Sequence, residues 1–172
     1  MNFVPNLYCD VFAAFIFYVL CLTLRNTRWR SFSTSRCSKK KIAWYRVDPQ
    51  TGELALQGDV PVPDDYQGGA CARMELHPSG RFLYATNRGH DSLAGFRIYP
   101  QSGALKSIGQ FPTEENPRSF HFDPQGRFLY AAGESNDRLR AYSLDDQSGA
   151  LDPLHTYETG HVPWWVQVVE PG

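Results

Sequence analysis

From Lys41 onward, short apolar runs alternate with tight polar turns, and no stretch of ten residues shows the 3.6-residue spacing of an amphipathic helix. The runs Phe82–Ala85 and Phe128–Ala131 both read FLYA, an aromatic and aliphatic composition that favours buried strands. Each run follows a Pro-Ser-Gly or Pro-Gln-Gly turn, in which proline presets φ and glycine tolerates a positive φ. The pattern predicts an all-β structure built from hairpins.

These hairpins belong to a repeat with a step of 46 residues. The segment His77–Asn87 (HPSGRFLYATN) returns as Asp123–Gly133 (DPQGRFLYAAG), and Ala94–Leu105 returns as Arg140–Leu151. An earlier copy of the second element, Ala43–Leu54, lies 51 residues upstream. Repeats of about 40 to 50 residues made of strands and tight turns are typical of β-propeller blades.

We therefore expect residues 42–172 to form a partial β-propeller of about three four-stranded blades. Gly160–Val169 aligns with the innermost strand of the preceding repeat, because Pro163 lies 46 residues after Pro117. An incomplete set of blades leaves strand edges open, and such edges would allow self-association or the binding of a partner.

Residues 1–41 form a leader of different composition. They hold the uncharged apolar run Val11–Leu24 and one acidic residue, Asp10, against seven basic residues: Arg25, Arg28, Arg30, Arg36, Lys39, Lys40 and Lys41. Because the whole chain has a net charge of −1, the remainder is acidic. We expect no nucleic-acid partner for it.

Three interpretations of the leader stay open. The first is a membrane anchor that contacts lipid through residues 3–24, although the apolar run is shorter than a spanning helix, which needs about 20 residues. The second is an organelle transit peptide, which the Arg- and Ser-rich segment Arg28–Arg36 resembles. The third is an artefact of gene prediction. In each case Val11–Leu24 is expected to form a helix that packs on nothing in the β domain.

The cysteines indicate neither a zinc site nor a disulfide framework, since no CxxC pair occurs among Cys9, Cys21, Cys37 and Cys71. A reducing compartment such as the cytoplasm is the simpler expectation, with membrane anchoring or organelle targeting through the leader as the alternative. No metal or other cofactor is expected.

The candidate chemistry lies in the turns that follow the repeated strands. The first copy continues Asn87-Arg88-Gly89-His90-Asp91, and the second continues Gly133-Glu134-Ser135-Asn136-Asp137. Loops on a rigid scaffold are where sites are built, and in propellers they surround a central channel. A histidine in a polar turn is as often structural, and an isolated glutamate is usually solvated.

From Lys41 to its end the chain resembles the C-terminal part of the seven-bladed β-propeller lactonase family. That family includes propeller-type 6-phosphogluconolactonases and the carboxy-muconate lactonizing enzyme. The motifs that carry the resemblance are Cys71-Ala72, His77–Phe96 (HPSGRFLYATNRGHDSLAGF) and Asn116–Ser135 (NPRSFHFDPQGRFLYAAGES). Many relatives have an Asp and a His near Arg73 and Glu75, so the polarity of the inner strand is changed here.

The resemblance implies that His90, Arg118 and Glu134 are catalytic, because they match the histidine, arginine and glutamate of the lactonizing enzyme. Asn87, Arg88 and Asp91 would bind substrate. Histidine is the side chain best suited to exchange protons near neutral pH, and a carboxylate from Asp91 or Glu134 would orient it. The guanidinium of Arg118 suits an oxyanion or a substrate anion.

The implied function is therefore hydrolysis of a sugar-acid lactone, 6-phosphogluconolactone above all, without a metal or cofactor. The same residues would also support ring closure, so a lactonizing cycloisomerase is an alternative. Another alternative comes from length: about 2.8 repeats follow the leader where the family has seven blades. A non-catalytic propeller remnant would then bind a partner through its open edge.

Overall fold

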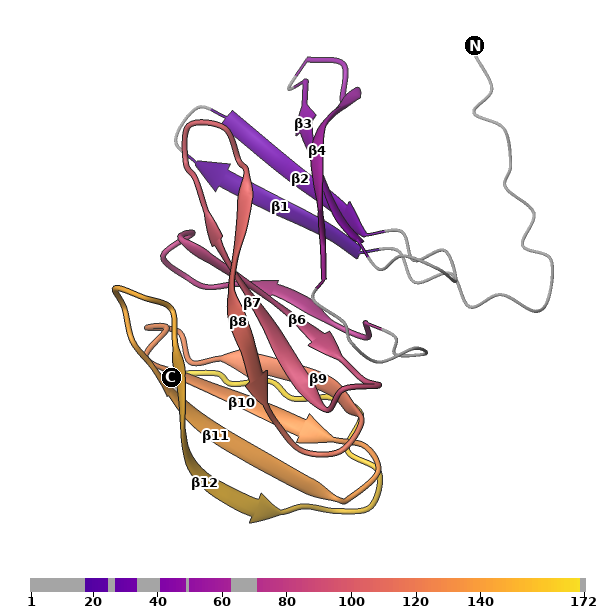
Figure 1. The fold of residues 1–172 in the computed structure, drawn as a ribbon, viewed down its shortest axis with the longest axis vertical. Helices are drawn as coiled ribbons and strands as arrows, with labels where there is room; N and C mark the ends of the chain where they lie inside the picture. The colour runs from indigo at the N-terminus through magenta and orange to yellow at the C-terminus, as the bar shows by residue number, and fades with distance from the viewer. Residues whose placement is uncertain (1–17, 25–26, 34–40, 49, 63–70, 171–172) are drawn as a thin grey trace, which may run out of the picture.

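The computed structural model describes residues 18–24, 27–33, 41–48, 50–62 and 71–170, with the backbone alone described for 18–24 and 27–33. Its described strands form three four-stranded antiparallel sheets, ordered β1-β2-β3-β4, β5-β6-β7-β8 and β9-β10-β11-β12. In Figure 1 these sheets follow one another along the long axis of the molecule, from indigo to orange. The prediction of an all-β, propeller-like architecture of about three blades is confirmed.

Each sheet is one blade whose strands follow in chain order. Blade 1 consists of β1 (Tyr18–Leu24), β2 (Thr27–Ser33), β3 (Lys41–Val47) and β4 (Leu54–Pro61). Blade 2 consists of β5 (Met74–Leu76), β6 (Phe82–Asn87), β7 (Ser92–Ile98) and β8 (Leu105–Pro112). Blade 3 consists of β9 (Pro117–Phe122), β10 (Phe128–Gly133), β11 (Arg138–Leu144) and β12 (Leu151–Glu158). The first strands of blades 1 and 2, β1 and β5, contact each other, and β6 of blade 2 contacts β9, the first strand of blade 3.

The leader differs from the prediction. Tyr18–Leu24, the second half of the apolar run, is a strand and not a helix, and it pairs with β2, which pairs with β3 from Trp29↔Arg46 to Ser33↔Ile42. The expectation that Val11–Leu24 packs on nothing in the β domain is therefore wrong for residues 18–24, which also contact β5. Residues 3–17 lie outside the described residues. Among the residues described, no helix is long and apolar enough to cross a membrane.

The apolar core lies between the blades. Along β6 the side chains alternate: Leu83 and Ala85 face blade 1, whereas Phe82 and Tyr84 face blade 3. All six residues of this strand are buried, because blade 2 has a neighbour on each side. A strand covered on both faces needs a continuous apolar run, which explains the uninterrupted FLYA sequence.

The two cores differ in composition. Between blades 1 and 2 the core is mainly aliphatic and includes Ile42, Leu83 and Ile98. Between blades 2 and 3 it is aromatic, with Tyr84 and Phe122 at a centroid distance of 5.5 Å and Phe120 and Phe122 at 6.0 Å, both edge to face. Such pairs each add about 0.5–1.5 kcal/mol beyond their buried area. The interface between blades 2 and 3 is therefore well packed and holds the two blades in a fixed position.

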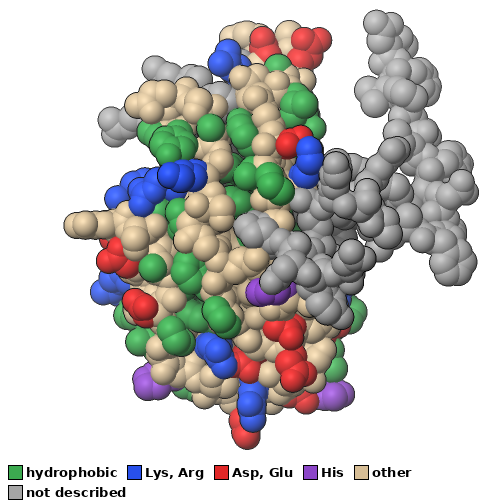
Figure 2. Space-filling view, in the orientation of Figure 1, with side chains coloured by type: hydrophobic (Ala, Val, Ile, Leu, Met, Phe, Trp, Pro, Cys, Tyr) green, Lys and Arg blue, Asp and Glu red, His purple; other side chains and the backbone are tan. Residues whose placement is uncertain are grey.

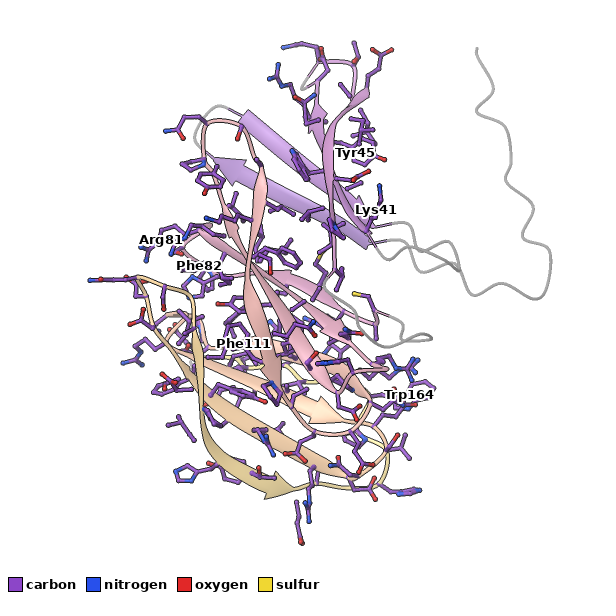
Figure 3. All side chains as sticks on the ribbon, in the orientation of Figure 1. Lys41, Tyr45, Arg81, Phe82, Phe111 and Trp164 are labelled. Carbon is purple, nitrogen blue, oxygen red and sulfur yellow. The ribbon has the colours of Figure 1, made fainter. Side chains whose placement is uncertain are left out.

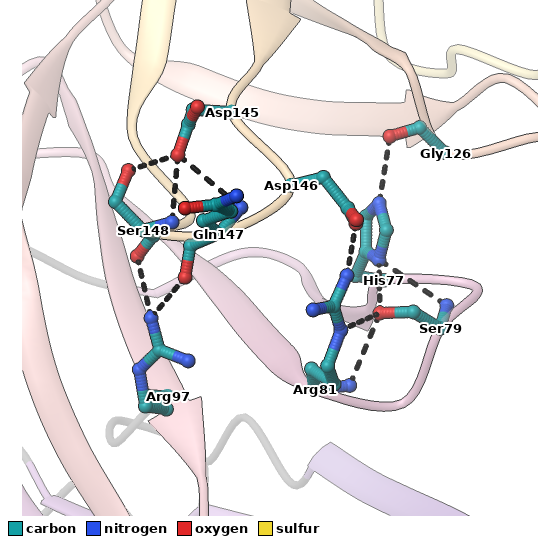
Figure 4. A network of polar contacts seen from close by, with 9 residues as sticks. All are labelled: His77, Ser79, Arg81, Arg97, Gly126, Asp145, Asp146, Gln147 and Ser148. Carbon is teal, nitrogen blue, oxygen red and sulfur yellow. Dashed lines mark hydrogen bonds and ion pairs between the residues drawn. The ribbon is translucent and has the colours of Figure 1, made fainter.

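A polar network joins the turns of blades 2 and 3 at one end of the blades (Figure 4). The buried His77 ring donates from Nε2 to the Gly126 carbonyl at 2.6 Å, and its Nδ1 accepts from Ser79. Arg81 pairs with Asp146, and Arg97 donates to the carbonyl of Ser148. We call this end, with turns 77–81, 99–104, 123–127 and 145–150, the hairpin end.

The space-filling view shows hydrophobic side chains spread among polar and charged ones on one face of the blades (Figure 2). The described residues expose large hydrophobic side chains mainly on outer strands and near the C-terminus: Leu54, Leu56, Tyr99, Leu154, Tyr157, Trp164, Trp165 and Val169. Trp164 and Trp165 are adjacent in the sequence, and both are exposed.

Candidate functional site

The candidate site lies at the end of blades 2 and 3 opposite the hairpin end, where turns 88–91, 113–116 and 134–137 meet. Arg88 follows β6 and Glu134 follows β10, at equivalent positions 46 residues apart in the repeat. Arg88 Nη2 contacts Glu134 Oε2 at 2.7 Å, and Arg118 Nη1 lies 3.3 Å from the same oxygen. Asn116 completes the group: its Oδ1 accepts from Arg88 Nε at 2.7 Å and its Nδ2 donates to Glu134 at 3.3 Å.

This cluster of Arg88, Asn116, Arg118 and Glu134 is the charged cluster of the site. Its charged side chains are only partly exposed, at 23% for Arg88, 33% for Arg118 and 17% for Glu134. Two guanidinium groups around one carboxylate leave the cluster with an excess positive charge. It can therefore orient a ligand anion or stabilise negative charge that develops on a carbonyl oxygen.

The turn that carries Arg88 is held by Asp91, which adopts a positive φ of 48°. Its Oδ1 accepts the backbone N–H of Asn116 at 2.7 Å, and its backbone carbonyl accepts from Thr113 at 2.8 Å. Blade 3 repeats the device, since Asp137 Oδ1 accepts the N–H of Val162 at 2.7 Å. Asp91 thus fixes the connection that delivers Asn116 to the charged cluster; a role in substrate binding stays a prediction.

His90 lies in the same turn as Arg88 but points to another partner. Its Nδ1 lies 2.9 Å from Ser92 Oγ, and the Ser92 hydroxyl donates to Gln110 on β8 at 3.0 Å. Because the serine proton is directed to Gln110, the serine oxygen can accept a hydrogen bond from Nδ1 of the neutral His90 ring. The structure brings Arg118 and Glu134 together with Arg88, whereas the described bond of the His90 ring leads toward the outer strands.

Asn87, the remaining candidate for substrate binding, is fully buried at the end of β6. Its backbone carbonyl accepts a hydrogen bond from the backbone N–H of His90 at 3.2 Å, and Asn87 pairs with Ser92 across the β6–β7 hairpin. Its described contacts therefore shape the turn from within the protein.

A second polar group on the inner strands was missed at the sequence level. Glu75 on β5 and His121 on β9 meet across the two blades, with 3.3 Å between Glu75 Oε1 and His121 Nε2. Arg73 contacts the other oxygen of Glu75 at 3.2 Å. Burial raises the pKa of Glu75, while the nearby Arg73 and His121 act in the opposite direction. The detectable signal was the step of 46 residues, which places Glu75 and His121 at equivalent positions of the two inner strands.

Glu114 is a buried carboxylate beside the charged cluster. Arg140 Nη2 lies 2.7 Å from its Oε1, and Asn136 donates to its Oε2 at 2.7 Å. Paired and hydrogen-bonded in this way, Glu114 ties the connection between the blades to β11. Among the residues that the structure describes, no group of three or more His, Cys, Asp and Glu side chains is placed to hold a metal ion.

Comparison with known proteins gives a consistent picture. The family model described as "Lactonase, 7-bladed beta-propeller" matches residues 38–168. The chain is 38% identical over 99 residues to the 6-phosphogluconolactonase of Bacillus subtilis, which covers 54% of this chain and 27% of that protein.

Solved structures share the fold. A protein from Lactobacillus plantarum matches with a TM-score of 0.75 at 32% identity, over 83% of this chain and 42% of that one. The periplasmic gluconolactonase of Pseudomonas aeruginosa matches with a TM-score of 0.67 at 28% identity, over 77% of this chain and 37% of that one. The chain spans between a fifth and two fifths of the length of the curated relatives that it matches.

Proposed function

The chain belongs to the seven-bladed β-propeller lactonase family, and on that premise we propose that it hydrolyses a sugar-acid lactone, with 6-phosphogluconolactone as the leading substrate. The observation that carries the proposal is the charged cluster, in which Arg88 and Arg118 surround Glu134 at the meeting point of two blades. Its excess positive charge suits a substrate that is itself anionic, such as a phosphorylated sugar lactone. Relatives named 6-phosphogluconolactonase support this choice.

Opening a lactone requires three things: a water molecule that loses a proton, stabilisation of the tetrahedral oxyanion, and a proton for the departing alkoxide. Arg118 and Arg88 would supply the positive charge, because the Glu134 carboxylate holds both guanidinium groups in place. His90 would exchange the proton through Nε2, since its Nδ1 is engaged with Ser92. No step in this scheme calls for a metal ion.

The proposal is tested by measuring kcat/KM for 6-phosphogluconolactone and gluconolactone above the spontaneous rate, with and without a chelator. We expect Arg118→Ala and His90→Ala each to lower kcat/KM by about 10²- to 10³-fold, the usual effect of removing a charge stabiliser or a general base. The chelator should have no effect. The matched controls are Arg127→Ala and His155→Ala, which alter exposed side chains away from the charged cluster.

The outcomes separate the alternatives. If the purified chain accelerates the hydrolysis of neither lactone, the proposal that it is a hydrolase is refuted. Net formation of a lactone from the open-chain acid, identified by product analysis, would favour the lactonizing reaction. Full activity of His90→Ala beside a strong loss in Arg118→Ala would remove His90 from the scheme and leave the charged cluster in it.

A further inference from the structure

The chain after β12 returns along the inner strand of blade 3. The N–H of Val166 donates to Ser119 Oγ at 3.0 Å, and the N–H of Val168 donates to His121 Nδ1 at 3.3 Å. The inner strand expected over Gly160–Val169 is not formed as a regular strand, although these bonds place the segment beside β9. We call this segment the C-terminal strap.

The strap also covers two arginines. The guanidinium carbon of Arg118 lies 4.2 Å from the ring centroid of Trp164, and that of Arg73 lies 4.4 Å from the ring centroid of Trp165. Figure 3 places Trp164 at the far side of the blades from the hairpin end. The strap thus lies over one guanidinium of the charged cluster and over one that contacts Glu75. It is held by single contacts and not by a regular ladder of backbone bonds, so the loss of one contact matters.

The His121 ring is in reach of two backbone groups that it cannot serve together. Its Nδ1 lies 2.7 Å from the carbonyl oxygen of Phe122 as well as 3.3 Å from the nitrogen of Val168. A carbonyl only accepts a hydrogen bond and a backbone N–H only donates one. With a lone pair, Nδ1 therefore holds Val168, and with a proton it donates to Phe122 and turns a like-charged N–H toward Val168.

Glu75 decides which of these forms the ring takes, because its Oε1 lies 3.3 Å from His121 Nε2. When the pair shares one proton, Nε2 donates it to the carboxylate and Nδ1 is left to accept. A second proton gives an imidazolium beside a carboxylate, or a carboxylic acid that donates to Nε2 of a neutral ring. Both arrangements put a hydrogen on Nδ1, so the number of protons on the pair matters and their location does not.

The surroundings of the pair contain few other titratable groups. Arg73 contacts the second oxygen of Glu75, and Tyr130 is the register partner of His121 on β10. On the strap itself, His161 pairs with Asp137 at 3.0 Å. Burial raises the pKa of Glu75, which favours uptake of a second proton by the pair.

We propose that Glu75 and His121 form a pH-dependent latch for the C-terminal strap. With one proton on the pair the strap is docked, and with two it is released as a unit, because the remaining contacts are few. Release uncovers Arg118 and opens the charged cluster to an anion from solvent. The consequence for catalysis rests on the proposed function, whereas the latch itself does not.

The experiment follows amide hydrogen exchange and the indole N–H resonances of the full chain by NMR between pH 5 and pH 8, the range in which histidine changes charge. Exchange rates are corrected for their intrinsic dependence on pH. We expect the amides of Val166 and Val168 to lose protection by about tenfold as the pH falls, in line with one lost hydrogen bond. The resonances of Trp164 and Trp165 should shift with the same midpoint.

Three variants locate the transition. His121→Asn offers an amide oxygen to Val168 and does not titrate, so the strap should stay docked throughout the range. Glu75→Gln removes the carboxylate that favours the imidazolium and should move the midpoint down by about one pH unit. His161→Gln is the matched control on the strap, and its midpoint should equal that of the parent.

Constant protection in the parent between pH 5 and pH 8, or an unchanged transition in His121→Asn, would overturn the latch. If His121→Asn does not fold, an unchanged midpoint in Glu75→Gln has the same meaning. A transition that disappears in His161→Gln would assign it to the Asp137 pair instead. Loss of protection at Val168 alone would reduce the release to fraying of the last residues and would refute the strap.

The latch and the proposed hydrolase fail separately. A transition that depends on His121, in a chain that hydrolyses no lactone, would keep the latch and refute the reaction. Hydrolysis by a chain without the transition would keep the reaction and refute the latch.

Discussion

Blades 2 and 3 contain the same FLYA strand, yet they bury it differently. Phe82–Ala85 in blade 2 is buried at every position, whereas in blade 3 Phe128 and Tyr130 are only partly buried and Leu129 and Ala131 are buried. The cause is the position of each blade, since among the described residues blade 2 has a blade on both sides and blade 3 has one. Equal sequences therefore need not contribute equally to stability.

The same two blades also differ in what their turns carry. The backbone device is identical, with Asp91 and Asp137 at positive φ and each holding the N–H of the next connection. The side chains that the device presents are opposite in charge, Arg88 in one copy and Glu134 in the other. Positions that repeat build the scaffold, and positions that break the repeat supply the chemistry. Substitutions at equivalent positions test this comparison.

The largest difference is expected for Phe82→Ala against Phe128→Ala. Phe82 is fully buried in the aromatic core, so its removal should cost about 3–5 kcal/mol of unfolding free energy. Phe128 keeps part of its ring in water, and its removal should cost roughly 1–2 kcal/mol. Urea denaturation of both variants measures the two values, and similar losses would show that the exposed face of blade 3 is covered in solution.

The next pair is Gly126→Ala against Gly80→Ala. Both glycines have a positive φ, 73° and 71°, which costs alanine about 1–2 kcal/mol. A Cβ at Gly80 meets open space, whereas one at Gly126 would overlap the His77 ring that bridges the blades. Gly126→Ala should therefore cost roughly 1–3 kcal/mol more than Gly80→Ala. Introducing His77→Ala should abolish that extra cost in a double-mutant cycle, and an unchanged difference would contradict the bridge.

A smaller effect is expected at the paired aspartates. Asp91→Ala removes the acceptor for the Asn116 N–H and should cost about 1 kcal/mol, together with activity, because Asn116 belongs to the charged cluster. Asp91→Asn keeps an acceptor oxygen and should cost less. Asp137→Ala should lower thermal stability in the same direction but leave Arg88 and Glu134 in place. Equal losses of activity in both alanine variants would refute this division.

The smallest effect concerns the pH dependence of Glu75. Burial raises its pKa above the ordinary 4.5, so the folded protein keeps this proton to a higher pH than the unfolded chain. The resulting stability is complete below about pH 4.5 and is lost as the pH rises through the folded-state pKa. Glu75→Gln should match the parent in acid and become the more stable protein toward neutral pH, with Glu158→Gln as the exposed control. If the parent is more stable than Glu75→Gln at neutral pH, the favourable contacts of Arg73 and His121 with the Glu75 carboxylate outweigh the cost of its burial.

The leader shows a limit of reasoning from local pattern. Val11–Leu24 is an uncharged apolar run, and a run of this composition is compatible with a buried helix or with a segment that contacts lipid. Tyr18–Leu24 instead becomes a strand because β3 presents an edge that β2 and then β1 extend. Pairing of this kind depends on a partner in space, which a window along the sequence does not contain.

The sequence by itself determined the blades, because strand composition, Pro-Gly turns and the 46-residue step are local properties that repeat. It also predicted that Arg118 and Glu134 lie at one end of the blades, since Arg118 stands at the start of an inner strand and Glu134 follows the strand after it. Only the tertiary structure decided that Arg88 joins them, that His90 is bonded toward Ser92, and that Glu75 faces His121 across two blades. Contacts between blades depend on how the sheets stack, and stacking is set by the packing of the whole core.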